Sequence, residues 1–354
     1  MKAYIRSTAS ISAQNTFGDT GFLTDVVEYQ STRLKAIEPD YKEYVDPKLI
    51  RRMSHVIKMG VAAAKECLNK AGITMPDAII TGTAFGIMED TVTFLTRIVE
   101  MQEEMLPPTS FIQSTHNTVA AQIALMLQCH NYNNTFVHKG ISFESALLDA
   151  LMLINEGEGE NILVGGIDEM IDASFKVLTR LGLYKRRPVS NLALFREQSK
   201  GTIGGEGASF FVLSKQPNAH TMAGLCGIKT FYDENTQLDV SDQITALLDE
   251  HGLTVKDLGL LITGKNGAPQ NDAPYERLKT GLFSGVPAVN YKHLSGEYST
   301  ASGFALWVAA NIISQKTVPV VLQERADMID PPKKILIYNH YQNKYHSLML
   351  VSAC

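Results

Sequence analysis

The chain has 354 residues, of which 45% are apolar and 19% are charged, and its net charge is −5. That composition supplies enough apolar surface for a large core and excludes an intrinsically disordered protein. The mildly acidic charge is spread along the chain, which disfavours nucleic-acid binding, and no apolar run reaches the ~18 residues of a membrane-spanning helix. The length predicts two units of roughly 150 to 200 residues each.

The four cysteines, Cys67, Cys129, Cys226 and Cys354, stand far apart and form no CxxC pair. Such spacing is typical of a protein in a reducing cytosol, and it disfavours both a disulfide framework and a zinc site. The first residues include no apolar segment with a cleavage site, so we expect no secretory signal. These observations predict a cytoplasmic protein without a metal.

Short apolar runs alternate with helical patterns along the chain, which predicts an α/β fold. In chain order we expect a helix from Asp46-Pro47 to Gly72, a strand at 78–82, helices at 88–103 and 116–128, a strand at 135–137, a helix at 142–155 and a strand at 161–164 that stops at Gly165-Gly166. The stretch 173–200 is the least regular, and its Lys185-Arg186-Arg187-Pro188 segment is expected to be a solvated loop.

The second half repeats features of the first. Ile80-Thr81-Gly82 recurs as Ile262-Thr263-Gly264, and a helix rich in small residues lies at the same distance beyond each, at Thr118 and at Thr300. The repeat predicts two similarly built halves, residues 1–218 and 219–354. Small residues permit close helix packing, so we consider that these two helices pack against each other.

The residues alone offer little catalytic machinery. His116, His130 and His138 are not spaced for a metal-binding helix face, and Asp168-Glu169 after a strand is more typical of a cap than of an acid/base pair. We interpret Ser142 as a helix N-cap, since no GxSxG turn is present, and Cys129 as a buried, inert thiol.

Taken in order, several segments resemble the β-ketoacyl-acyl carrier protein synthases. The segments are Asn117–Leu125 (interface helix), Asn161–Asp168 (strand with a double glycine), Gly201 with Gly205–Ala208 (glycine turn), and Gly264–Asp272 and Lys292–Glu297 (the two histidine motifs). The resemblance implies the thiolase-like fold, a five-layered αβαβα sandwich of two similar halves that forms a tight dimer.

The resemblance also assigns the family's catalytic positions. Counting forward from Asn117 or backward from Gly157 places the nucleophilic cysteine at Gly140, and Ile141 or Ser142 takes the site only through compensating gaps. The two catalytic histidines fall at Gly264 and Glu297, whereas the family lysine is kept as Lys292. Residues 340–345 replace the glycine-rich turn that completes the family's oxyanion hole.

Condensation needs a thiolate to attack the thioester and two imidazole N–H groups to stabilise the enolate. Losing one such donor typically lowers the rate by about 10²–10³. Glycine has no donor, and an ionised Glu297 would oppose the developing negative charge. We therefore expect no catalytic residues, no cofactor, and an internal ion pair between Glu297 and Lys292.

These substitutions are similar to those of chain-length factors, which pair with an active ketosynthase in polyketide and aryl-polyene pathways. The resemblance implies a ketosynthase partner or self-association, together with acyl carrier protein. Two alternatives stay open: an active 3-oxoacyl synthase or acyltransferase that uses displaced groups such as Ser142 or Cys129 with His138 or His116, and a homodimeric acyl-binding protein. Bulky Phe143, Phe304 and Trp307 are candidates for an acyl tunnel, although core packing is their default interpretation.

Overall fold

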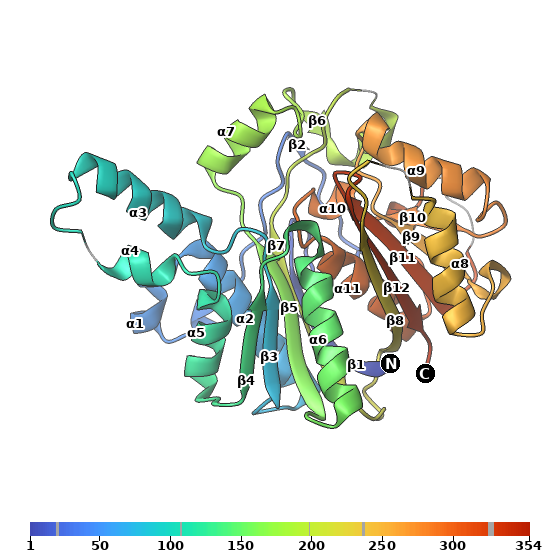
Figure 1. The fold of residues 1–354 in the computed structure, drawn as a ribbon, viewed down its shortest axis with the longest axis horizontal. Helices are drawn as coiled ribbons and strands as arrows, with labels where there is room; N and C mark the ends of the chain where they lie inside the picture. The colour runs from blue at the N-terminus through green and yellow to red at the C-terminus, as the bar shows by residue number, and fades with distance from the viewer. Residues whose placement is uncertain (19–20, 107, 198, 236–237, 325–328) are drawn as a thin grey trace.

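The computed structural model describes residues 1–18, 21–106, 108–197, 199–235, 238–324 and 329–354 (Figure 1). A mixed sheet runs through it in the order β10-β9-β11-β12-β8-β1-β7-β5-β3-β4. Its strands are β1 (Ala3–Ile11), β3 (Ala78–Gly82), β4 (Tyr132–Phe136), β5 (Asn161–Asp168), β7 (Gly207–Ser214), β8 (Ala223–Tyr232), β9 (Leu260–Thr263), β10 (Ala288–Asn290), β11 (Lys334–Tyr341) and β12 (Tyr345–Ser352). A separate ribbon pairs β2 (Gln30–Ser31) with β6 (Val189–Ser190).

The sheet consists of two halves with the same connectivity. β1 is antiparallel to β7 and β7 to β5, whereas β5, β3 and β4 are parallel. β8, β12, β11, β9 and β10 repeat that pattern in the same order. A short antiparallel pairing of Ala3–Ile5 with Ala223–Leu225 joins the halves. The boundary predicted near residue 218 falls in the connection from β7 to β8 and stays a prediction.

Helices complete five layers. α2 (His55–Ala71) and α5 (Thr118–Leu127) pack on one outer face, α6 (Ser142–Glu156) and α11 (Ser302–Gln315) lie between the two half-sheets, and α8 (Val240–Glu250) with α9 (Pro269–Thr280) cover the other outer face. The largest apolar cluster surrounds the middle helices. This arrangement confirms the predicted αβαβα sandwich. The two small-residue helices, α5 and α11, lie in different layers, so their predicted mutual packing is wrong.

Two predicted boundaries in the first half are wrong. The helix expected from Asp46 divides into α1 (Pro47–Ile50) and α2, because Ser54 adopts an extended conformation. β5 continues through Gly165-Gly166 to Asp168. These glycines stay in the strand because both pair with β7 on one side and with β3 on the other. Glycine is needed at both positions because a side chain at Gly165 would collide with the Phe210 ring, and one at Gly166 would crowd Phe143.

The stretch 173–200 is more ordered than the sequence predicts. It contains most of α7 (Asp172–Arg180), and Lys185 is buried rather than solvated. The Lys185 Nζ donates to the carbonyl and hydroxyl oxygens of Ser199, each at 3.0 Å, and to the carbonyl of Gly267 at 3.4 Å. These acceptors replace water, so the solvated-loop prediction is wrong at this residue.

The remaining helices lie mostly near the ends of the strands. They are α3 (Met88–Glu100), α4 (Pro108–Gln113) and α10 (Lys292–Ser295). Figure 1 shows α3 and α4 projecting from the side of the molecule on which β4 ends the sheet. In the part of the chain that the structure describes, no helix is long and apolar enough to cross a membrane.

Candidate functional site

The turn between β4 and α6 occupies the position that the resemblance assigns to the nucleophile. Lys139–Ile141 form a single 3₁₀ turn, in which Lys139 has a φ of 50°. A left-handed conformation costs an L residue roughly 1–2 kcal/mol, and such strain concentrates at functional turns. Gly140 follows Lys139 and is buried. This strained turn, Lys139–Ile141, is therefore present, and we call it the elbow. Its central residue, Gly140, carries no reactive group.

Tyr341 fills the space above Gly140. A Cβ added at residue 140 would collide with the Cβ of Tyr341 and lie 2.8 Å from its Cγ. Burial raises the pKa of the Tyr341 phenol to about 12, so this ring is neutral at physiological pH. Because Tyr341 belongs to β11, a side chain at residue 140 requires that ring or its strand to move.

The first histidine position is closed in the same way. Gly264 follows β9, and a Cβ added there would collide with Oδ1 of Asn339 and lie 2.6 Å from the hydroxyl of Tyr275. Both groups have partners: Asn339 Oδ1 accepts from the Tyr291 hydroxyl at 2.9 Å, and the Tyr275 hydroxyl accepts from the His340 N–H at 2.9 Å. A satisfied polar network thus surrounds Gly264.

The second histidine position holds a buried ion pair. Lys292 Nζ lies 2.9 Å from each carboxylate oxygen of Glu297, and Asn266 Nδ2 donates to Glu297 Oε2 at 2.7 Å. Lys292 also donates to the carbonyl of His340 at 3.4 Å, so all three ammonium protons face acceptors. The side chains are only 1% and 8% exposed. The ion pair predicted from the sequence is confirmed, and the Lys292 ammonium has no proton left to donate to another group.

His340 is the histidine nearest this pair in the hydrogen-bond network, but its ring is occupied. Nδ1 accepts from the Asn343 N–H at 3.0 Å, so Nε2 carries the proton and donates to the Asn271 carbonyl at 2.8 Å. Burial and the Lys292 charge lower the pKa of His340 well below its usual value. The ring is a neutral structural group that stacks on Tyr275.

The two candidate displaced nucleophiles are not activated. The Ser142 hydroxyl donates to the Lys139 carbonyl at 2.8 Å and accepts from the His138 N–H at 2.7 Å. It closes the 3₁₀ turn instead of capping α6, because Ser142 is the first helical residue; the N-cap prediction is wrong. Cys129 is buried before the start of β4, at the opposite end of that strand from the elbow, and its Sγ lies 3.7 Å from the Pro76 carbonyl.

The other histidines singled out from the sequence do not join the site either. His138 Nδ1 lies 3.4 Å from the hydroxyl of Ser145, not from that of Ser142. His116 packs against Gly86 beside a small cavity of about 10 Å³. Across the described ranges, no three His, Cys, Asp or Glu side chains gather as a metal site.

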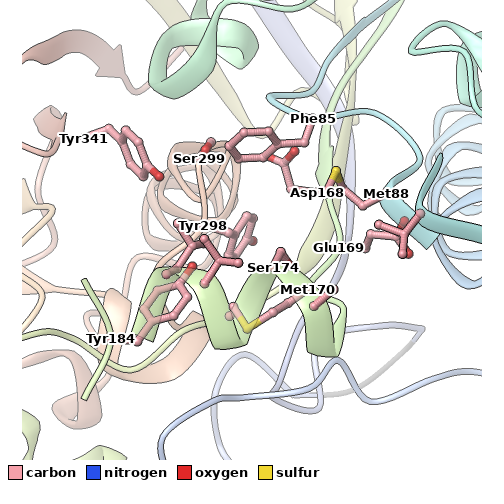
Figure 2. A pocket seen from close by; sticks show the side chains of 15 residues that line it. Phe85, Met88, Asp168, Glu169, Met170, Ser174, Tyr184, Tyr298, Ser299 and Tyr341 are labelled. Atoms are coloured by element: carbon pink, nitrogen blue, oxygen red, sulfur yellow. The ribbon is translucent and has the colours of Figure 1, made fainter. Parts of the chain in front are cut away.

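A cavity of about 320 Å³ opens beside Tyr341 (Figure 2). Its wall is mainly apolar and aromatic, and includes Phe85, Met88, Met170, Val177, Tyr184 and Tyr298. In Figure 2 the labelled side chains of this wall, Phe85, Met88, Met170, Tyr184 and Tyr298, surround a space that has Tyr341 on one side. The volume and lining suit an apolar chain rather than a charged group.

Two carboxylates border this cavity. Asp168 accepts four hydrogen bonds, from the Thr83 hydroxyl, the Ala84 N–H and both the N–H and hydroxyl of Thr300, at 2.8–3.0 Å. Glu169 accepts from the Glu89 N–H in the first turn of α3 at 2.9 Å, although the N-cap residue of α3 is Ile87. The helix that follows Glu169, α7, has Ile171 at its N-cap and no side-chain cap bond, so the predicted cap is not formed there. Burial raises the pKa of Glu169 to about 7. Asp168 is thus structural, whereas Glu169 titrates near neutrality.

Neither this cavity nor the role of Asn266 was predicted from the sequence. The residues that line the cavity come from at least five separate segments, and no local pattern marks residues that converge only in the folded chain. Asn266 lies inside the Gly264–Asp272 segment noted above. Its backbone N–H donates to Asp272 at 2.7 Å, which orients the amide toward Glu297. The position of Asn266 inside the Gly264–Asp272 motif was the one feature of the sequence that pointed to a role at this site.

Comparison with known proteins places these features in a family. The sequence profile described as "Beta-ketoacyl synthase, N-terminal domain" matches residues 31–219, more than half of the chain. The chain belongs to the β-ketoacyl synthase family. No curated protein sequence matches it significantly.

Solved structures with the synthase fold align over almost the whole chain. The ishigamide ketosynthase/chain length factor has a TM-score of 0.81 at 15% identity and covers 100% of this chain and 99% of that chain. A β-ketoacyl synthase from Burkholderia phymatum STM815 has a TM-score of 0.80 at 14% identity, with coverages of 100% and 99%. The ketosynthase ApeO in complex with its chain length factor ApeC, from Xenorhabdus doucetiae, has a TM-score of 0.74 at 15% identity, with coverages of 99% and 98%. At these identities the likeness shows the fold alone.

Proposed function

We propose that this protein is a non-catalytic β-ketoacyl synthase homologue, similar to a chain-length factor, that acts with an active ketosynthase in acyl chain elongation. One observation carries the proposal: the three assigned catalytic positions are closed or neutralised. Tyr341 covers Gly140, Asn339 and Tyr275 surround Gly264, and Lys292 neutralises Glu297. The loss of a thiolate together with both imidazole donors removes the condensation mechanism rather than slowing it.

The cavity beside Tyr341 supports a role with acyl chains. It is apolar and of a size that accepts a small organic ligand or part of a longer chain. A partner that carries the nucleophile would supply the thioester, and this subunit would supply room for its chain. Acyl carrier protein is then the source of the substrate, and no cofactor is needed.

An exposed apolar face supports a protein partner. Val99, Phe111, Ile112 and Leu125, on α3, α4 and α5, are each more than half exposed, and we call them the α3–α5 face. Figure 1 shows these helices on the side of β4. Among the described strands β4 pairs with β3 alone and stands at the end of the sheet, so its other edge is unpaired there. Apolar residues beside an open edge are typical of an interface.

Two of the similar solved structures support this assignment. Both the ishigamide complex and the ApeO–ApeC complex unite a ketosynthase with a chain length factor. A reducing cytoplasm is the compartment that we propose, since all four cysteines are free thiols.

Co-expression with an intact ketosynthase, one that has its cysteine and both histidines, tests the proposal. We expect a 1:1 complex in size exclusion with light scattering, and products from acyl and malonyl carrier proteins whose length distribution depends on this subunit. Leu125→Asp should break the complex, whereas the matched control Val320→Asp, at an exposed site outside the α3–α5 face, should not. A stable homodimer that forms no complex with any co-expressed ketosynthase would favour the acyl-binding alternative and contradict the proposal.

A further inference from the structure

A second cavity, of about 470 Å³, lies where β1 separates from β8. We call it the Arg6 cavity; its lining includes Arg6, Phe22, Lys70, His220, Trp307 and Gln315. It shares no lining residue with the cavity beside Tyr341. Lys70 lies in the last turn of α2 and Gln315 is the last residue of α11, whereas the assigned catalytic position at Gly140 precedes α6.

A β-bulge places Arg6 in this cavity. In the pairing of β1 with β7, Ile5 faces Leu213 and Ser7 faces Val212, so Arg6 is the extra residue between them. A bulge breaks the alternation of side chains, and bulges often redirect a residue toward a site. Before the bulge Ile5 points to the middle layer, and after it Ala9 points to the outer layer.

The Arg6 guanidinium has no acceptor among the described residues. Its Nε is buried without a hydrogen-bond partner, and no carboxylate of the residues that the structure describes lies within ion-pair distance of the group. A half-buried cation without a partner is costly, and in native structures such groups call for a specific explanation.

The surroundings of Arg6 are positive and partly apolar. No aspartate or glutamate lines the cavity in the described part of the chain, and Lys70 adds a second cation, although its Nζ also lies 3.1 Å from Glu66. His220 adds ring nitrogens, and Phe22 packs edge-on against Trp307 at 5.5 Å to form an apolar wall. The cavity therefore combines a free guanidinium with an aromatic surface.

We propose that the Arg6 cavity binds a phosphate ester, with the phosphate on Arg6 and the organic group against Phe22 and Trp307. A guanidinium holds two phosphate oxygens at once, and charge-assisted hydrogen bonds of this kind are stronger than neutral ones. The cavity also has room for an organic group beyond the phosphate. This site is independent of the proposed function, because it lies apart from the acyl cavity and the α3–α5 face.

Trp307 makes the proposal directly testable, since it is the only tryptophan in the chain and lines the cavity. The purified full-length protein is titrated with inorganic phosphate and with phenyl phosphate at constant ionic strength, while tryptophan fluorescence is recorded; phenol is the uncharged control. We expect saturable changes with both phosphates, tighter binding of phenyl phosphate, and no saturation with phenol.

Two variants and a control locate the binding site. Arg6→Gln should weaken phenyl phosphate binding by about 10- to 100-fold. Gln315→Glu adds a negative charge at an exposed position of the lining and should weaken phenyl phosphate binding while Arg6 is kept. The control Arg51→Gln, at an exposed site outside the lining, should leave this binding unchanged. If neither phosphate gives a saturable signal, or if both lining variants bind as the wild type does, the proposal is overturned.

Discussion

The Lys292–Glu297 pair offers the sharpest test of the remodelled reaction centre. Glu297→Gln keeps the size of the side chain but removes its charge, and so leaves the Lys292 ammonium buried without a counter-ion. Lys292 is 1% exposed, and both of its 2.9 Å contacts to Glu297 lose their charge. Breaking a buried pair by removing one partner typically costs about 3–5 kcal/mol. Since small domains are stable by about 5–15 kcal/mol, this single change should remove a large share of the stability.

Urea unfolding followed by circular dichroism measures this loss as the free energy of unfolding. The double variant Lys292→Met/Glu297→Gln removes the stranded charge, so it should be more stable than Glu297→Gln alone. Asp172→Asn, which breaks an exposed pair with Arg33, serves as the control and should leave the unfolding midpoint almost unchanged. A loss below about 1 kcal/mol for Glu297→Gln, or a double variant no more stable than the single one, would refute the reasoning.

Three further predictions concern the elbow and the cavity beside Tyr341. Gly140→Cys should destabilise the fold by about 1–3 kcal/mol, because the new side chain collides with Tyr341, and Tyr341→Gly in the same chain should recover part of that loss in urea unfolding. Lys139→Gly should be about 1 kcal/mol more stable than Lys139→Ala, since only glycine adopts a φ of 50° without strain; equal urea midpoints would contradict this explanation. The pKa of Glu169 is raised to about 7 by burial, so the folded state binds its proton more tightly than the unfolded state does, and stability should fall as the pH rises from about 4.5 to 7. Glu169→Gln should show a shallower fall over that range in thermal unfolding, and identical pH profiles would rule out this carboxyl as the cause.

Local patterns predicted much of the architecture. Ile80-Thr81-Gly82 and Ile262-Thr263-Gly264 lie on β3 and at the end of β9, which are equivalent strands of the two half-sheets. The Lys292–Glu297 pair was also predictable, because the family motif places Lys292 and Glu297 five residues apart at the reaction centre, and two opposite charges need each other once they are buried.

Features that depend on distant parts of the chain were not predictable. Lys185 is buried because the Gly267 carbonyl, 82 residues away, accepts from its ammonium group. The bulge at Arg6 depends on the register of β1 against β7, which no local pattern encodes. Tyr341 covers Gly140 only because β11 reaches the β4–α6 turn. Contacts of this kind arise from tertiary structure.

Mass spectrometry of the intact protein tests the central claim most directly. The protein is incubated with acyl carrier protein that bears a labelled acyl thioester, alone and together with an active ketosynthase. We expect the mass of this chain to stay unchanged in both cases, while the ketosynthase gains the acyl group. A stoichiometric acyl adduct on this chain, at Ser142, Cys129 or any other residue, would show that it carries a working nucleophile and would contradict the account.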